Sequence, residues 1–144
     1  MNATVFVDTN VLIYALDPTD LVKQRAAQAW RSDLWNRENG RISFQVLQEF
    51  YAKVIYKWPS ARKEARDEVR DLLAWRPVSV SADILNNAWS FQDRYQLSFW
   101  DALIVAAAKS LSCRYLLTED FQSGQNLDGL IVVSPFLSDP GSLS

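Results

Sequence analysis

Short apolar segments of strand length alternate along this chain with longer segments that have the spacing of helices. Strands buried on both faces of a parallel sheet read as continuous apolar runs, and their alternation with helices is typical of α/β proteins. Strands are predicted at residues 4–7, 41–43, 78–80, 115–117 and 130–133. Helices are predicted at about 11–16, 21–40, 45–57, 61–75 and 99–111, and a further helix opens at Ser81. No linker divides the 144 residues, so we expect one α/β domain over residues 1–144 with a mostly parallel sheet.

The composition excludes several kinds of site. Histidine is absent, which removes the commonest general base and every catalytic triad that contains histidine. Cys113 is the only cysteine, so neither an intramolecular disulfide nor a cysteine zinc cage can form. The longest uninterrupted apolar stretch, residues 102–108, is far too short to cross a bilayer. We therefore expect a protein of the reducing cytoplasm that has no membrane partner.

Acidic residues follow three of the predicted strands. In open α/β sheets the ligand crevice lies beyond the carboxyl ends of the strands, so residues just after strands are the first candidates for a site. Asp8 follows the first strand directly, and Glu49 lies near the start of the helix after the second strand. Asp101 lies in the first turn of the helix opened by Ser98. Two adjacent acids, Glu119 and Asp120, follow the strand at 115–117.

Each of these acids also has an ordinary structural explanation. Asp8 could cap the first helix, and Asp101 could favour a helix N-terminus by about 0.3–1 kcal/mol. Glu49 could pair with Lys53 four residues later for about 0.2–0.5 kcal/mol. The two acids after the strand at 115–117 could be turn residues.

Position favours a functional explanation for two of them. Asp101 shares its helical face with Leu97, Ile104 and Ala108, a surface that we expect to be buried, and a lone buried charge is costly. Glu49 falls at the margin of the apolar stripe of its helix, where a side chain can face a crevice.

Converging carboxylates need a positive partner. Two carboxylates about 4 Å apart repel by roughly 4 kcal/mol at an effective dielectric of 20. Magnesium prefers oxygen ligands and typically takes one or two carboxylates directly while it keeps several waters, and manganese suits the same ligands. The sequence therefore predicts a Mg²⁺ or Mn²⁺ site rather than a zinc site, with one or two ions left open.

The remaining charges and aromatic residues say less about substrate. The formal net charge is −2, so the chain without these four carboxylates is slightly basic. Arg62, Arg66 and Arg70 recur every four residues, but acids share their helix, which favours an ordinary solvated face over an RNA groove.

Of the six tryptophans, Trp30, Trp89 and Trp100 lie at or near apolar helical positions, which indicates core or interface packing. Trp35 and Trp58 lie near helix ends and are weaker candidates for partner contact.

Four segments resemble PIN-domain nucleases, and most closely the bacterial toxin branch known as VapC. In chain order they are VFVDTNVLIYALD, FQVLQEF, SFWDALIVAAA and YLLTEDFQSG, and the resemblance extends over essentially the whole chain. It implies a PIN-like three-layer α/β/α sandwich with a central, mostly parallel sheet. The family's acidic residues carry over as Asp8, Glu49, Asp101 and Asp120, with Glu119 as the alternative for the fourth acid.

The resemblance also implies an activity and partners. The implied activity is that of a Mg²⁺- or Mn²⁺-dependent endoribonuclease that hydrolyses RNA through a metal-activated water. The implied partners are a second copy of the chain in a homodimer and a cognate antitoxin, which inhibits the enzyme in a type II toxin–antitoxin system. The resemblance assigns metal binding to Asp8 and a supporting hydroxyl contact to Thr9, and it leaves Asn10 to local bonding at the helix start.

Two other functions are weighed against this one. A phosphatase of the haloacid dehalogenase type also has an aspartate after its first strand, but it needs a second aspartate two positions later, where this chain has Asn10. A non-catalytic PIN-like module that binds nucleic acid or protein is the other alternative, and the presence of all four acids argues against it.

Overall fold

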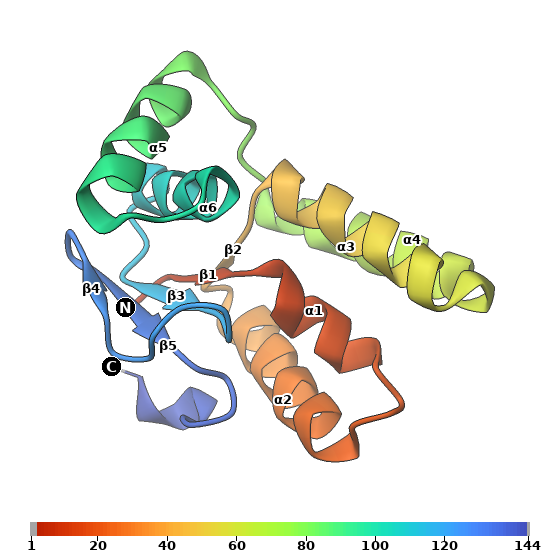
Figure 1. Cartoon of the computed structure of the whole chain (residues 1–144). Coiled ribbons are helices and arrows are strands. Elements are labelled where there is room, and N and C mark those ends of the chain that lie inside the picture. The colour runs from red at the N-terminus through yellow and green to blue at the C-terminus, as the bar shows by residue number, and fades with distance from the viewer. Residues whose placement is uncertain (1–2, 144) are drawn as a thin grey trace.

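A five-stranded sheet forms the centre of the protein (Figure 1). The structure, a computed structural model, describes residues 3–143. The strands are β1 (Val5–Val7), β2 (Gly40–Arg41), β3 (Tyr115–Leu117), β4 (Asn126–Leu127) and β5 (Leu130–Val133). Their order in the sheet is β2-β1-β3-β5-β4, and only β4 runs antiparallel to its neighbour.

The helices pack against one another in consecutive pairs: α1 with α2, α3 with α4, and α5 with α6 (Figure 1). Their bounds are α1 (Thr9–Leu16), α2 (Leu21–Arg37), α3 (Phe44–Lys57), α4 (Arg62–Leu72), α5 (Ala82–Tyr95) and α6 (Phe99–Ser110). Short 3₁₀ turns lie at Pro59–Ala61, Leu73–Trp75 and Pro140–Ser142. None of the helices within residues 3–143 is both long and apolar enough to span a membrane.

The strand order places the α1–α2 and α5–α6 pairs on opposite faces of the sheet. The chain moves from β1 outward to β2 and later returns to β3 on the other side of β1. Because such crossovers are right-handed, the helices of the two connections cover opposite faces. The result is the predicted three-layer α/β/α sandwich, and its switch point lies between β1 and β3, where ligands of open α/β sheets bind.

Polar side chains cap four of the helices, and Ser81 and Ser98 do so as predicted. The N-cap side chains accept hydrogen bonds from first-turn backbone N–H groups, which satisfies donors that have no partner within the helix. These caps are Asp20 for α2, Ser43 for α3, Ser81 for α5 and Ser98 for α6.

The hydrophobic core explains most of the strand and helix assignments. Strands β1 and β3 are buried at every residue, and so are residues 102–108 of α6. Trp30 is buried as predicted, and its indole N–H donates to the carbonyls of Pro135 and Ser138. Trp89 and Trp100 are instead 52% and 63% exposed, which excludes core packing for both in the isolated chain.

The predicted strand at residues 78–80 is wrong. Val78 forms only an isolated parallel bridge with Ser43, and Val80 is exposed. Pro77 lacks a backbone N–H, so this segment has fewer donors available for strand pairing. The alternating valines therefore lie in a connection between α4 and α5.

Strand β4 was not predicted. It pairs with β5 through a tight turn at Asp128 and Gly129, whose φ values are 57° and 95°. An Asp-Gly pair is a hairpin signal because both residues tolerate positive φ, so the sequence did hold this information. Two predicted helix ends also differ, since α2 ends at Arg37 and α4 passes into a 3₁₀ turn after Leu72.

Candidate functional site

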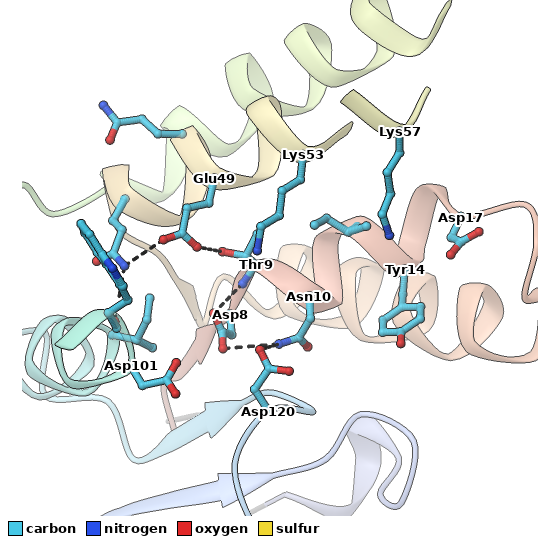
Figure 2. Close-up of a pocket in the computed structure, with 15 residues that line it drawn as sticks. Asp8, Thr9, Asn10, Tyr14, Asp17, Glu49, Lys53, Lys57, Asp101 and Asp120 are labelled. Atoms are coloured by element: carbon cyan, nitrogen blue, oxygen red, sulfur yellow. Dashed lines mark hydrogen bonds between the residues drawn. The ribbon is translucent and has the colours of Figure 1, made fainter. Parts of the chain in front are cut away.

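A cleft of about 920 Å³ opens at the carboxyl ends of β1 and β3, beside the switch point of the sheet. Its walls come from α1, α3, α6 and the loop after β3. Figure 2 shows the predicted acids facing this space from four separate segments. All five residues predicted for the site line the cleft: Asp8, Thr9, Glu49, Asp101 and Asp120.

Asp8 is the most buried of these acids. It follows β1 directly, caps α1, and is only 5% exposed. Its carboxylate accepts hydrogen bonds from the Thr9 backbone N–H at 2.7 Å and from the Thr118 hydroxyl at 2.8 Å. Burial is the main reason that the pKa of Asp8 is nevertheless raised to about 6, and the negative charges of Asp120 and Asp101 contribute to that rise. Asp8 therefore caps a helix and also faces the cleft.

Glu49 is held by neighbouring polar groups. Its Oε2 accepts from the Thr9 hydroxyl at 3.2 Å, and its Oε1 accepts from the Gln45 side-chain amide at 3.1 Å. The hydroxyl of Thr9, for which the resemblance implied a supporting contact, thus lies on the Glu49 carboxylate. Within residues 3–143 Glu49 forms no ion pair with Lys53, so the alternative of a simple helical pair is wrong.

Asp101 reaches the cleft from the first turn of α6. Its backbone N–H donates to the Ser98 hydroxyl at 3.1 Å, which orients the start of the helix. Partial burial raises the pKa of the Asp101 carboxyl, and the charges of Asp120 and Glu49 add to this effect. Asp101 and Asp120 thus each raise the pKa of Asp8, which means that the carboxylates from separate segments are close enough to interact.

The two adjacent acids after β3 point in different directions. Glu119 forms an ion pair with Lys23 at 2.8 Å, and it does not line the cleft. Asp120 lines the cleft, and its Oδ2 accepts from the Asn10 side-chain amide at 3.2 Å. The geometry therefore favours Asp120 over Glu119 as the fourth acid of the cleft.

Asn10 does more than the local bonding expected of it. Its side-chain amide donates to Asp8 at 3.4 Å, to Thr118 at 3.0 Å and to Asp120, while its carbonyl oxygen accepts from the Glu119 backbone N–H. These bonds tie α1 to the loop after β3. The expectation that Asn10 serves only the helix start is wrong, because sequence distance hid the partners that the parallel pairing of β1 and β3 brings beside it.

Sequence reasoning missed Thr118, which is fully buried beside Asp8. Its hydroxyl donates to Asp8 and accepts from the Asp120 backbone N–H at 3.1 Å. The register pairs Val7 with Leu117, so the next residue on each strand, Asp8 and Thr118, lie side by side. A polar residue directly after a buried strand was the available signal.

Two lysines of the cleft were also missed as site residues. Lys53 and Lys57 lie four and eight residues after Glu49 on α3, and both line the same cleft. Figure 2 shows both side chains reaching from α3 toward α1. No ion pair within residues 3–143 involves either lysine. The helical period was the available signal, since it places residues 49, 53 and 57 on one face.

The donor set of the cleft suits a hard divalent cation. Carboxylate oxygens line it, and neither histidine nor cysteine does. In the part of the chain that the structure describes, no three such groups lie close enough to bind one ion together. Magnesium needs only one or two direct carboxylates and keeps several waters, so carboxylates that reach one cleft from separate segments fit it.

Fold and cleft together define a class: a parallel α/β/α sandwich whose separate acidic residues meet beyond the carboxyl ends of β1 and β3. The family model of the PIN domain matches residues 5–123. The chain belongs to the PIN domain family. Membership of this family disfavours the phosphatase alternative.

Several solved structures share this fold. One chain of a toxin–antitoxin complex from Klebsiella pneumoniae is 24% identical in sequence to this chain and superposes with a TM-score of 0.60. The match covers 92% of this chain and 98% of that chain. The Mycobacterium tuberculosis toxin VapC20, described as cleaving the sarcin-ricin loop, is 21% identical, with a TM-score of 0.61 over 78% and 87%. VapBC2 from Rickettsia felis, bound to a promoter DNA fragment, is 17% identical, with a TM-score of 0.61 over 91% and 98%. No curated protein sequence matches the chain.

Proposed function

We propose that this protein is a Mg²⁺- or Mn²⁺-dependent endoribonuclease that acts as the toxin of a type II toxin–antitoxin system. The observation that carries the proposal is the convergence of Asp8, Glu49, Asp101 and Asp120 on one cleft at the switch point of the sheet. PIN-family membership supports nuclease chemistry at this position. The likeness in fold to a toxin described as cleaving the sarcin-ricin loop supports RNA as the substrate.

The carboxylates divide into two roles in this proposal. Asp8 and Asp101 would hold the ion directly, while Glu49 and Asp120 would bind it through water or orient the attacking water. A bound divalent ion lowers the pKa of a coordinated water and neutralises charge that develops on the phosphate oxygens. This route needs no histidine, which matches the composition of the chain.

Neighbouring polar groups keep the carboxylates in position. Thr9 and Gln45 donate to the two oxygens of Glu49, which fixes the plane of that carboxylate. The Asn10 amide donates to the carboxylates of Asp8 and Asp120, and the Thr118 hydroxyl donates to Asp8 and accepts from the Asp120 backbone N–H. Such contacts around metal-binding carboxylates orient them and typically change metal affinity or activity by about 10–100-fold.

Lys53 and Lys57 would bind the phosphates of the substrate beside the acidic end of the cleft. They are cations without an ion-pair partner among residues 3–143, and both line the cleft. An RNA strand that passes from the carboxylates along α3 would meet both lysines. Attraction of phosphates to lysine side chains supplies affinity without sequence preference.

The proposed partners are an antitoxin protein and a second copy of the chain in a homodimer. The solved structures with the same fold include toxin–antitoxin complexes, which supports the antitoxin as a partner. The exposed Trp89 and Trp100 give α5 and α6 large aromatic surface for a protein contact. A reducing cytoplasm is the proposed location, consistent with the unpaired Cys113.

Cleavage of structured RNA by the purified protein tests the function. We expect cleavage with Mg²⁺ or Mn²⁺, none with EDTA, and none with the folded variants Asp8→Asn and Asp101→Asn. Asp93→Asn on the outer face of α5 is the matched control and should cleave normally. Undiminished cleavage by Asp101→Asn, or by the wild-type protein in EDTA, would exclude the proposal.

A further inference from the structure

A second cavity, of about 620 Å³, lies at the opposite end of the sheet from the acidic cleft. Glu38 and Leu111 line it, and each comes shortly before a parallel strand, β2 and β3 respectively. The cavity is therefore at the amino ends of the strands, whereas the acidic cleft is at their carboxyl ends. Its volume is in the usual range for small-molecule sites. The residues that give it chemical character are Trp35, Glu38, Arg41, Trp75, Arg76 and Leu111.

Two tryptophans form a supported aromatic wall of this cavity. The ring centroids of Trp35 and Trp75 are 6.3 Å apart, with the planes tilted by 34°. The Arg31 guanidinium lies over both rings, 4.7 Å and 5.6 Å from their centroids, and Glu68 holds it through two hydrogen bonds. Trp35 still exposes 39% of its surface. The wall is thus held in place and has aromatic surface left for a flat ring.

Two arginines of the cavity have unused donors. Neither Arg41 nor Arg76 forms an ion pair within residues 3–143. Arg41 is anchored because its Nη1 donates to the carbonyls of Glu38 and Gly40, at 3.2 Å and 2.8 Å. Its remaining N–H groups have no acceptor in the described part of the chain. A guanidinium matches the geometry of phosphate, so the pair suits an anionic group beside the aromatic wall.

Charged side chains stand here at backbone positions that favour glycine. Glu38 ends α2 with φ of 58°, and Arg76 follows the 3₁₀ turn after α4 with φ of 54°. Glycine or asparagine is usual at such left-handed positions because other residues are strained there. Glycine would be less strained than the present residue at both positions.

We propose that this cavity binds a nucleoside phosphate unit, either as a free nucleotide or as one nucleotide of an RNA strand. The base stacks on Trp35, the phosphate lies between Arg41 and Arg76, and the Glu38 carboxylate accepts hydrogen bonds from ribose hydroxyls. Each part of the ligand has a matching group in the cavity. The site is separate from the acidic cleft, and binding to it does not depend on the proposed cleavage activity.

Calorimetric titration of the whole chain with AMP tests this site, with EDTA present so that no metal occupies the acidic cleft. We expect AMP to saturate one site. Adenosine lacks the phosphate and ribose 5-phosphate lacks the base, so each should bind about tenfold more weakly than AMP or weaker still. Trp35→Ala and Arg76→Gly should each weaken AMP binding about tenfold or more, a typical loss for one stacked base or one phosphate contact. Arg76→Gly should keep or raise the melting temperature because it relieves a strained position.

Matched controls locate the bound nucleotide. Trp89→Ala and Arg62→Ala change an exposed tryptophan and an exposed arginine elsewhere, and both should bind AMP as the wild type does. The double variant Lys53→Ala, Lys57→Ala should also bind AMP normally. If the lysine variant loses AMP binding while Trp35→Ala keeps it, the nucleotide occupies the acidic cleft and the proposal is wrong.

A single-stranded RNA oligomer, titrated in EDTA, distinguishes the two sources of the ligand. If the site holds one nucleotide of an RNA strand, Trp35→Ala and Arg76→Gly weaken oligomer binding about tenfold. If it holds a free nucleotide, they weaken only AMP binding. Affinities for AMP and for the oligomer that both stay unchanged in these two variants would overturn the proposal.

Discussion

At the scale of single residues, the buried charge of Asp8 is a cost that a metal ion would offset. Its carboxylate is almost fully buried, and its pKa is raised from 3.8 to about 6. Between about pH 4 and pH 6 the folded state keeps a proton that the unfolded chain has lost. The free energy of unfolding of the metal-free protein should therefore fall as the pH rises through this range, by about 3 kcal/mol.

Asp8→Asn should remove this pH dependence. In EDTA at pH 7 the variant should be more stable than the wild type, by up to about 3 kcal/mol, because it no longer buries a charge. Urea unfolding at pH 4, 5, 6 and 7 measures this difference. Asp93→Asn is the control, and its stability should follow the wild-type pH curve. A variant that loses stability at pH 7 would show that the charge of Asp8 is not a cost to the fold.

Asn10 should affect metal binding at the site indirectly, by positioning the carboxylates. Asn10→Ala removes the amide that bridges Asp8, Thr118 and Asp120, so we expect a 10–100-fold higher Mg²⁺ requirement for RNA cleavage. A magnesium titration of the cleavage rate measures this requirement. Asn87→Ala, at an exposed position of α5, should leave it unchanged. An unchanged requirement in Asn10→Ala would remove Asn10 from the site.

The sequence contained part of this residue-level account. Asp8, Glu49 and Asp120 follow from a general rule about strand ends, Asp101 follows from its position on an apolar helix face, and all four line one cleft. Thr118, Lys53 and Lys57 were not found, because their proximity depends on strand register and on which helix face meets the cleft. The choice of Asp120 over Glu119 depends on the position of Lys23, which lies 96 residues before Glu119 and forms an ion pair with it.

At the scale of elements, α3 presents one face with two kinds of charge to the cleft. If Lys53 and Lys57 bind substrate phosphates, their double replacement by alanine should raise KM for RNA. The slope of log affinity against log salt should become shallower by about 1 for each lysine. Lys63→Ala on α4 is the control, since Lys63 is paired with Asp67 and does not line the cleft. An unchanged salt slope in the double variant would place the RNA elsewhere.

Strand β2 packs against the turn after α4 at Gly40, where there is no room for a side chain. A Cβ atom at Gly40 would lie 2.4 Å from the ring of Trp75. Gly40→Ala should therefore destabilise the protein by about 1–3 kcal/mol, the usual cost of overpacking. A urea titration measures this cost. Gly141→Ala, where no atom lies within 4 Å, should be close to neutral, and equal effects of the two changes would contradict the packing described here.

Strands and helices were predictable from the sequence where a single pattern, such as an apolar run or a capping residue, marked them clearly. Apolar runs located β1, β3 and β5, and capping side chains located the starts of α2, α5 and α6. Alternating valines were misleading at 78–80, because the partner that would pair with them contributes only one bridge at Ser43. The short edge strand β4 has only two residues, too few for a periodic pattern, and only its Asp-Gly turn indicated it.

At the scale of the whole molecule, the strand order decides where the chemistry can occur. The chain leaves β1 in one direction and returns on the other side, so helices diverge at the carboxyl ends of β1 and β3 and leave a cleft between them. Each of these strands is followed by a polar residue: Asp8 lines the cleft, and Thr118 donates a hydrogen bond to Asp8. The amino ends of β2 and β3 lie beside the second cavity, which Trp35 and Trp75 line, so the two proposed sites are at opposite ends of the sheet.

The most direct test of the metal site is a crystal structure of the protein with Mn²⁺, with the ion located from its anomalous scattering. We predict an anomalous-difference peak in the acidic cleft within direct coordination distance of Asp8 and Asp101, with Glu49 and Asp120 around it. Asp8 and Asp101 carboxylates that coordinate no ion at a saturating Mn²⁺ concentration, or a peak that lies only outside the cleft, would contradict it.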